Sequence, residues 1–181
     1  MDDSALIRRA QAGDKAAFAA LLESYYDLLF RFAHKWCGSR ADAEDITQQA
    51  CIKLARSLSQ FRFESAFSSW LYRLVINCAK DWYKTQVRHQ GDDASQVEEA
   101  ISGDADAETG IYLQQVLRAL EQMAEGFKET ALLVHAEGLT HAEAAKILAV
   151  KESTVSWRLH EIRKQLHSLH QPVGFMQEVR P

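Results

Sequence analysis

The stretch that decides the fold of the C-terminal half is LTHAEAAKILAVKESTVSWRLHEIRKQL, residues 139–166. It combines a short helical pattern, a turn over residues 149–152 and a longer amphipathic pattern. Thr140 and Glu143 have the spacing of a capping box, in which each side chain satisfies a free backbone amide of the first helical turn. Together these features predict a helix-turn-helix.

The second helix of this motif has two distinct faces. Val155, Leu159 and Ile162 recur at helical spacing and predict the buried face. The opposite face presents Thr154, Trp157, Arg158, Glu161 and Lys164. Early residues of such a helix enter the major groove of DNA, and basic residues bind phosphates. An ordinary helical hairpin with a solvated charged face is the alternative.

An acidic segment separates this half from the rest of the chain. The stretch GDDASQVEEAISGDADAETG, residues 91–110, contains seven acidic residues and no basic one. Such a composition predicts a flexible linker. After it we expect helices over residues 112–124, 127–136, 140–148 and 153–169, followed by a tail over residues 171–181 that resembles nothing we identify.

The first 90 residues also have a helical pattern. We expect helices over residues 4–12, from a cap at Asp14 to a stop at Gly38, from Asp42 through Leu58, and over residues 67–88. The only prolines are Pro172 and Pro181, which favours helices throughout the body. The predicted fold is all-α, with two small helical domains joined by a flexible acidic linker and a helix-turn-helix in the C-terminal domain.

A polar stripe follows one face of the helix predicted over residues 67–88. Its members, spaced by three or four residues, are Arg73, Asn77, Lys80, Lys84 and Arg88. Residues 61–88 hold five basic and two acidic side chains, although the whole chain has a net charge of −4. Such a stripe could neutralise DNA phosphates, with salt-dependent binding. A solvated helix face without a ligand is the alternative.

Aromatic residues gather just before and within that stripe: Phe61, Phe63, Phe67, Trp70 and Tyr72. Phe67 and Trp70 fit the helix core. Phe61 and Phe63 fall in a loop, where exposed rings could stack on unpaired bases. Packing beneath the loop is the other interpretation of both rings.

Composition argues against several other classes of protein. Cys37, Cys51 and Cys78 are widely spaced, which predicts free thiols in a reducing cytosol. We expect no signal peptide, membrane insertion, cofactor or catalytic site, because the chain has no apolar leader, no ~20-residue apolar run and no Gly-rich phosphate loop. His34 with Cys37 indicates core packing rather than a metal site. The spacing of His160, His167 and His170 leaves a metal-binding or pH-sensing alternative.

Four stretches in order resemble the extracytoplasmic-function (ECF) group of bacterial sigma factors. They are DKAAFAALLESYYDLLFRFAHKWCGSRADAEDITQQACIKL, FRFESAFSSWLYRLVINCAKDWYK, the acidic linker and the helix-turn-helix. The resemblance covers about residues 6–169. It implies a domain that binds core polymerase and the minus-ten element (1–90), the linker (91–110), a domain for the minus-thirty-five element (111–170) and the tail (171–181).

The resemblance also implies roles for individual residues. Core RNA polymerase would contact Asp42, Glu44, Asp45, Gln48 and Gln49. The minus-ten strand of promoter DNA would contact Phe63, Glu64, Ser65, Ala66, Arg73, Asn77, Lys80, Lys84 and Arg88, with one base flipped into the loop over residues 63–66. The minus-thirty-five element would contact Thr140, Ser153, Thr154, Ser156, Trp157, Arg158, Glu161, Arg163 and Lys164. The function implied is that of a cytoplasmic sigma factor, which binds core RNA polymerase and directs promoter-specific transcription initiation. An anti-sigma factor would hold it until a stress or envelope signal arrives.

The chain departs from the family pattern in its DNA-reading helix. Where the family resembles TVKSRLHRAR, this chain has TVSWRLHEIR, so Ser156, Trp157 and Glu161 replace Lys, Ser and Arg. The loss of positive charge should weaken phosphate binding. Two other functions stay open: a helix-turn-helix regulator that acts without polymerase, and a decoy that binds anti-sigma proteins, which the depleted positive charge favours.

Overall fold

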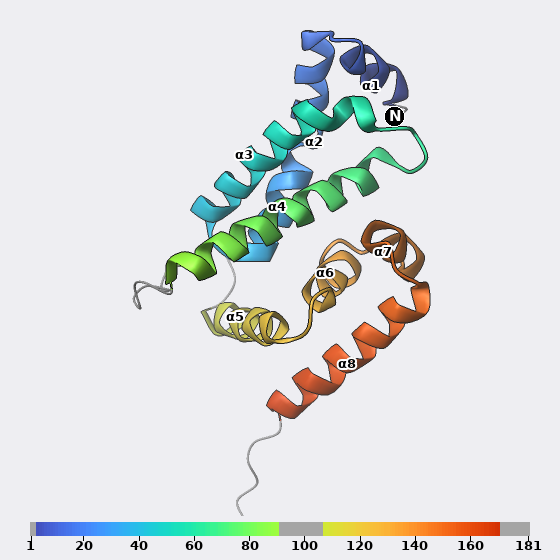
Figure 1. Cartoon of the computed structure of the whole chain (residues 1–181). Helices are drawn as coiled ribbons and strands as arrows, with labels where there is room; N and C mark the ends of the chain where they lie inside the picture. Colours follow the sequence, from blue (N-terminus) through green and yellow to red (C-terminus); the bar gives the residue numbers. More distant parts are fainter. Residues whose placement is uncertain (1–2, 91–106, 171–181) are drawn as a thin grey trace, which may run out of the picture.

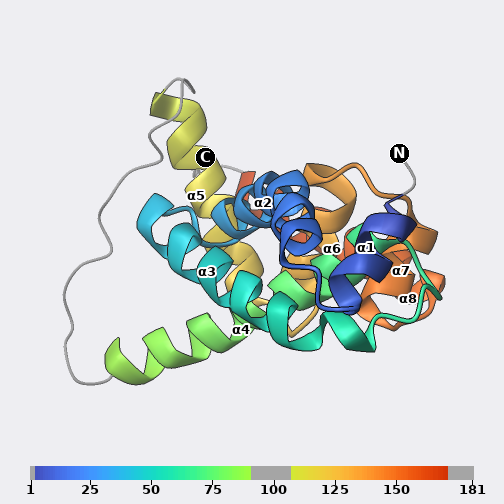
Figure 2. The same cartoon turned by 90° about the horizontal axis from the view of Figure 1, so that it is seen from above.

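The computed structural model describes residues 3–90 and 107–170. Within these ranges every regular element is a helix, as Figure 1 shows. The helices form two groups, one from each side of residues 91–106, and the second group lies against the first (Figures 1 and 2). The predicted all-α fold is confirmed.

The first half contains α1 (Ser4–Gln11), α2 (Lys15–Cys37), α3 (Arg40–Ser57), the 3-10 turn η1 (Leu58–Gln60) and α4 (Phe67–Gln90). The Asp14 carboxylate accepts a hydrogen bond from the amide of Ala17 at 3.0 Å, so it caps α2 as predicted. Gly38 ends α2 with φ 73°, a left-handed conformation that glycine adopts without a steric penalty. These local signals set where α2 begins and ends.

The core of the first half lies where α2, α3 and α4 meet. Phe32 is fully buried on α2, and its ring lies 5.5 Å from that of Tyr72 on α4. Leu54 from α3 and Leu71 from α4 are fully buried as well. Apolar contacts thus hold the three helices together, and the polar residues of α4 lie on the face that points away from this core.

The second half contains α5 (Ala107–Gln122), α6 (Phe127–Ala131), the π-helical turn η2 (Leu132–Ala136), α7 (His141–Leu148) and α8 (Glu152–His170). Both hydrogen bonds of the predicted capping box are present, between Thr140 and Glu143. The turn from α7 to α8 passes through Ala149 in the left-handed region, at φ 54°. The helix-turn-helix is therefore present in this half.

The predicted linker and the observed helices differ at one end. Helix α5 begins at Ala107, four residues inside the segment expected to be flexible. Alanine and glutamate, which occupy positions 107 and 108, are strong helix formers, so the acidic composition did not prevent helix formation there. The rest of the predicted linker, residues 91–106, and the tail over residues 171–181 lie outside the described residues.

The two halves meet along a polar junction. Helix α4 contacts α7, and α2 contacts η2. Lys35 of α2 donates to the carboxylate of Glu137 and to the carbonyl oxygen of Ala136, both at 2.8 Å. Tyr72 of α4 donates to the other carboxylate oxygen of Glu137 at 2.8 Å. One glutamate after η2 therefore binds two helices of the first half.

Replacing Phe32 by alanine tests the core of the first half. Because the ring is fully buried, Phe32→Ala should lower the free energy of unfolding by about 3–5 kcal/mol. Urea unfolding followed by circular dichroism measures the change. Tyr26→Ala, on the same helix but exposed, should cost about 1 kcal/mol or less. Equal losses for the two variants would contradict this description of the core.

Candidate nucleic-acid interface

Helix α8 presents most of its predicted DNA-facing residues to solvent. Val155, Leu159 and Ile162 are buried, as the apolar pattern predicted. Thr154 and Glu161 are half-buried. The exposed candidates are Thr140 at the start of α7 and Ser153, Ser156, Trp157, Arg163 and Lys164 on α8. The motif thus offers a polar, accessible surface around the start of α8.

Two side-chain contacts shape that surface. His141 Nδ1 lies 3.0 Å from Ser156 Oγ, which also donates to the carbonyl oxygen of Glu152 at 3.2 Å. Trp157 is 54% exposed, and its ring packs edge-to-face against buried Phe127 at 5.4 Å. The indole is thus held on one side and open to a ligand on the other.

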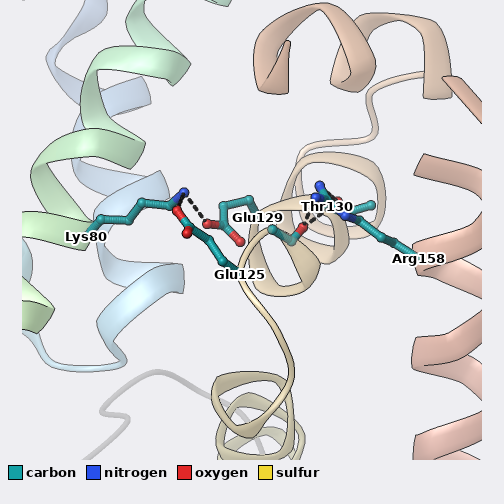
Figure 3. Close-up of polar contacts among 6 residues, drawn as sticks. Lys80, Glu125, Glu129, Thr130 and Arg158 are labelled. Atoms are coloured by element: carbon teal, nitrogen blue, oxygen red, sulfur yellow. Dashed lines mark hydrogen bonds and ion pairs between the residues drawn. The ribbon is translucent and has the colours of Figure 1, made fainter. Parts of the chain in front are cut away.

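Arg158 points inward instead of outward. Its guanidinium donates to the carbonyl oxygen of Gly126 at 3.3 Å and to Thr130 Oγ1 at 3.4 Å (Figure 3). Gly126 has φ 93°, and a Cβ atom there would collide with the guanidinium. Arg158 therefore joins α8 to the start of α6, a tertiary contact that helical periodicity does not reveal.

The polar stripe of α4 lies at the junction between the halves. Arg73 donates to the carbonyl oxygens of Lys146 at 2.6 Å and Ile147 at 3.0 Å, near the C-terminal end of α7. Lys80 donates to Glu125. Asn77 and Lys84 are exposed, and the Arg88 side chain lies outside the described residues. The stripe is present, but two of its basic residues are bound by the second half.

Lys80 makes two ion pairs across the junction (Figure 3). Its Nζ lies 2.8 Å from Glu125 Oε1 and 2.7 Å from Glu129 Oε1. Burial alone would lower the pKa of Lys80, but hydrogen bonds to these carboxylates raise it above its usual value. The same hydrogen bond lowers the pKa of Glu125. Lys80 and Glu125 are therefore both charged at neutral pH.

The loop before α4 is partly packed and partly open. Phe61 is buried against Phe67 and Trp70, with ring centroids 5.1 and 5.6 Å apart, so packing beneath the loop describes this ring. Phe63 is half-buried at φ 61°, and the Arg8 guanidinium lies 4.3 Å from its centroid. The next three residues, Glu64, Ser65 and Ala66, are exposed. The open part of the loop is next to the start of α4.

A second candidate surface lies on α3. Glu44, Asp45, Gln48 and Gln49 are exposed, whereas Asp42 is half-buried in the first turn. Glu44 pairs with Arg40 at 3.1 Å. Ile52 is 39% exposed and follows Asp45 by seven residues, so it extends the same face by two helical turns. Sequence reasoning missed Ile52, although an apolar residue at this spacing was a readable signal.

Residues 3–90 and 107–170 hold no group of three or more His, Cys, Asp or Glu side chains suited to a metal ion. The Cys37 thiol donates to carbonyl oxygens of Ala33 and Ser39, and burial raises its pKa to about 11. Among the helices described, none has the length and apolarity needed to cross a membrane.

The described residues form helices, with a helix-turn-helix in one half and a separate polar helical surface in the other. These features are typical of the class of DNA-binding transcription proteins. Comparison with known families makes this specific. Residues 21–89 match the family model for Sigma-70 region 2, and residues 113–166 match the model for Sigma-70 region 4.

The chain is also similar to curated sigma factors of the ECF group. The chain is 30% identical to the ECF RNA polymerase sigma-E factor of Haemophilus influenzae, over 96% of this chain and 97% of the relative. It is 31% identical to the protein of that name from Escherichia coli strain K12, over 96% of both chains. The chain belongs to the ECF sigma factors of RNA polymerase. It is therefore a transcription initiation factor. Its family is not an enzyme family.

Solved structures share the fold. CnrH, determined in complex with the cytosolic domain of CnrY, gives a TM-score of 0.67 at 22% identity, over 92% of this chain and 96% of CnrH. The sigma factor RpoE of Bartonella quintana, determined with the anti-sigma factor NepR, gives 0.62 at 22% identity, over 84% of this chain and 95% of RpoE. The two-domain helical architecture is thus shared with CnrH and with the sigma factor RpoE.

Removing the Arg158 side chain tests its inward role. Arg158→Ala should lower the free energy of unfolding by about 1–3 kcal/mol, because the carbonyl of Gly126 and the hydroxyl of Thr130 lose a charged partner. Chemical denaturation measures the loss. Arg163→Ala, on the exposed face of the same helix, should change stability by about 0.5 kcal/mol or less. A stability for Arg158→Ala within error of the parent would exclude this role.

Proposed function

We propose that residues 1–90 bind core RNA polymerase and the separated minus-ten strand of the promoter, and that residues 111–170 bind the duplex at the minus-thirty-five element. The observation that carries this proposal is the adjacency of the exposed loop over residues 64–66 to the polar stripe on α4. A flipped base needs a shaped receptor, and the strand that carries it needs cations along its phosphates. The loop and the stripe supply these two parts on neighbouring segments.

On α4, Asn77 and Lys84 are accessible partners for the strand. An amide at position 77 can donate to and accept from a base edge, while Lys84 can bind phosphate. Arg73 and Lys80 contribute once their contacts with the second half are released. The open loop residues, with half-buried Phe63 beside them, form the receptor for the flipped base.

In the second half, base reading falls to exposed and half-buried side chains in the first ten residues of α8. The indole of Trp157 can contact a thymine methyl group, and the carboxylate of Glu161 can accept a hydrogen bond from cytosine N4. Ser156, held by His141, can donate or accept. Arg163 and Lys164 supply phosphate contacts, and Thr140 and Ser153 supply further ones. Arg158 serves this surface by fixing α8 to α6.

The α3 surface is the proposed contact with core polymerase. Asp45, Gln48 and Gln49 share one helix face with Ile52, so the surface combines a charge, two amides and an apolar residue. Asp42 and Glu44 flank it. Interfaces commonly place an apolar residue at the centre of a polar patch.

Regulation by an anti-sigma factor is the third part of the proposal. Two proteins of the same fold were determined with a second protein, CnrH with the cytosolic domain of CnrY and the sigma factor RpoE with the anti-sigma factor NepR. We infer that this chain is held in the same manner in the cytoplasm, where polymerase and chromosome meet, and that a stress or envelope signal releases it.

Asn77→Ala tests the strand contact. The variant should bind core polymerase like the parent but open promoters about tenfold less, because an amide that contacts the displaced strand is lost. Permanganate reactivity of unpaired thymines measures opening, and competition for core measures binding. Thr85→Ala, an exposed polar change on the same helix, is the control. Equal loss of opening and core binding in Asn77→Ala would count against this assignment.

Asp45→Arg tests the polymerase contact. Reversing the charge at an exposed position should raise the Kd for core polymerase about tenfold, since the partner surface would then face a like charge. Competition against a labelled sigma factor gives the Kd. Asp27→Arg makes the same charge change on exposed α2 and should have little effect. A parental Kd for Asp45→Arg would remove this residue from the site.

A further inference from the structure

Helix α1 lies beside the loop that leads into α4. Figures 1 and 2 show it next to the segment between η1 and α4, and α1 contacts η1. The family model for Sigma-70 region 2 matches residues 21–89, so it begins after α1 has ended at Gln11. The match to that model therefore assigns no role to α1.

Gln11 joins α1 to the start of this loop. Its side-chain amide donates to the carbonyl oxygens of Leu58 at 2.9 Å and Phe61 at 2.8 Å. One helical turn earlier, Ile7 is only 2% exposed, so α1 is anchored in the core of the first half. The two carbonyl groups are satisfied from α1, and the helix and the loop entry are held as one unit.

The ring of Phe63 is held in a defined position on this loop. Phe63 has φ 61°, a left-handed conformation that is uncommon for a bulky residue. Its ring centroid lies 4.9 Å from that of Phe61, which packs in turn against Phe67 and Trp70 of α4. Residues in such conformations persist where neighbouring contacts hold them, and they gather at binding sites. The held ring is next to the exposed residues 64–66.

Arg8 of α1 places a positive charge on this ring. Its guanidinium carbon lies 4.3 Å from the ring centroid of Phe63, and the residue is exposed. Within residues 3–90 and 107–170 no carboxylate forms an ion pair with Arg8, whereas the neighbouring Arg9 binds Asp14 at 2.7 Å. Contact with the face of a ring leaves the five N–H donors of a guanidinium available to oxygen acceptors. Arg8 is therefore an oriented cation without a bound anion.

We propose that the Arg8–Phe63 pair is a phosphate-binding site for the unpaired promoter strand, beside the receptor for the flipped base and accessible in the free chain. This inference rests on the proposed role of the loop and the α4 stripe in strand binding. A guanidinium matches two oxygens of one phosphate, and stacking on a ring orients it before the strand arrives. The loop then has a cation on α1 as well as those on α4.

The proposed contact has a distinctive signature. A phosphate is the same in every nucleotide, so Arg8 should raise the affinity for any unpaired strand and leave base choice to the loop. Neutralising a phosphate also releases counterions, which makes the Kd depend on salt concentration. A residue that only packs against the loop would not contribute to that salt dependence.

The test uses the full-length chain and a fluorescein-labelled single-stranded DNA pool of random sequence. Fluorescence anisotropy gives the Kd at several salt concentrations. Arg8→Gln should raise the Kd at low salt by about threefold to tenfold, because one charge-assisted contact is lost. It should also reduce the slope of log Kd against log salt by about 0.7, the value for one phosphate of a single strand.

Two control variants isolate the site. Arg9→Gln removes the same charge one residue away, from a guanidinium that Asp14 already binds, and it should raise the Kd by less than about twofold. Phe63→Gly removes the ring at a φ that glycine adopts freely. In the Phe63→Gly background, Arg8→Gln should have little further effect, because the guanidinium has lost its support. Circular dichroism checks that each variant is folded.

Each outcome decides a separate point. Equal Kd values for Arg8→Gln and Arg9→Gln, an unchanged salt slope, or a parent that does not bind the pool would overturn the phosphate site. An equal effect of Arg8→Gln with and without the Phe63 ring would overturn the stacked pair. Lys84→Gln tests the proposed α4 contact on the same probe. A raised Kd for Lys84→Gln alone would remove only Arg8 from the strand-binding surface, and parental values for both variants would overturn strand binding by both helices.

Discussion

Polar contacts between the two halves, among them the ion pairs of Lys80 with Glu125 and Glu129, constrain how the halves are arranged. These ion pairs join a helix of the first half to the start of α6, and Glu137 adds a second connection through Lys35 and Tyr72. Burial and hydrogen bonding to this glutamate raise the pKa of Tyr72, so its hydroxyl remains a donor at neutral pH. The same contacts decide which residues of α4 are available to a ligand.

Helix boundaries were predictable from sequence because the signals that set them are local. Asp14, Gly38 and the Thr140–Glu143 capping box each act within one helical turn, and the structure confirms all three. The buried stripe of α8 followed from spacing alone. Acidic composition was a poorer guide, since it placed Ala107 in a linker although the residue begins α5.

The contacts made by individual site residues were less predictable, because they depend on segments distant in sequence. Helical periodicity placed Arg158 on an outward face, but Gly126 and Thr130 bind its guanidinium from α6 and the turn before it. The glutamates that bind Lys80 lie 45 and 49 residues further along the chain. Only the packed structure shows that part of the proposed strand-binding surface faces the chain's own carboxylates.

Within the proposed function, the altered sequence of helix α8 has a consistent physical interpretation. Ser156 and Glu161 stand where the family resemblance has basic residues, and Arg158 points inward, so α8 offers fewer cations to phosphate than the family pattern does. Weak binding of the second half to DNA is compatible with function when core polymerase holds both halves near the promoter, because a tethered domain binds at high effective concentration.

Run-off transcription with purified core RNA polymerase, with and without this chain, on a pool of promoter fragments, distinguishes a working sigma factor from the alternatives. A sigma factor yields discrete transcripts that appear only when the chain is added, and the fragments that yield them define its promoter. Core binding without any transcript would instead support a decoy that captures anti-sigma proteins. Sequence-specific duplex binding in the absence of core would support an independent regulator, and either result would contradict the account.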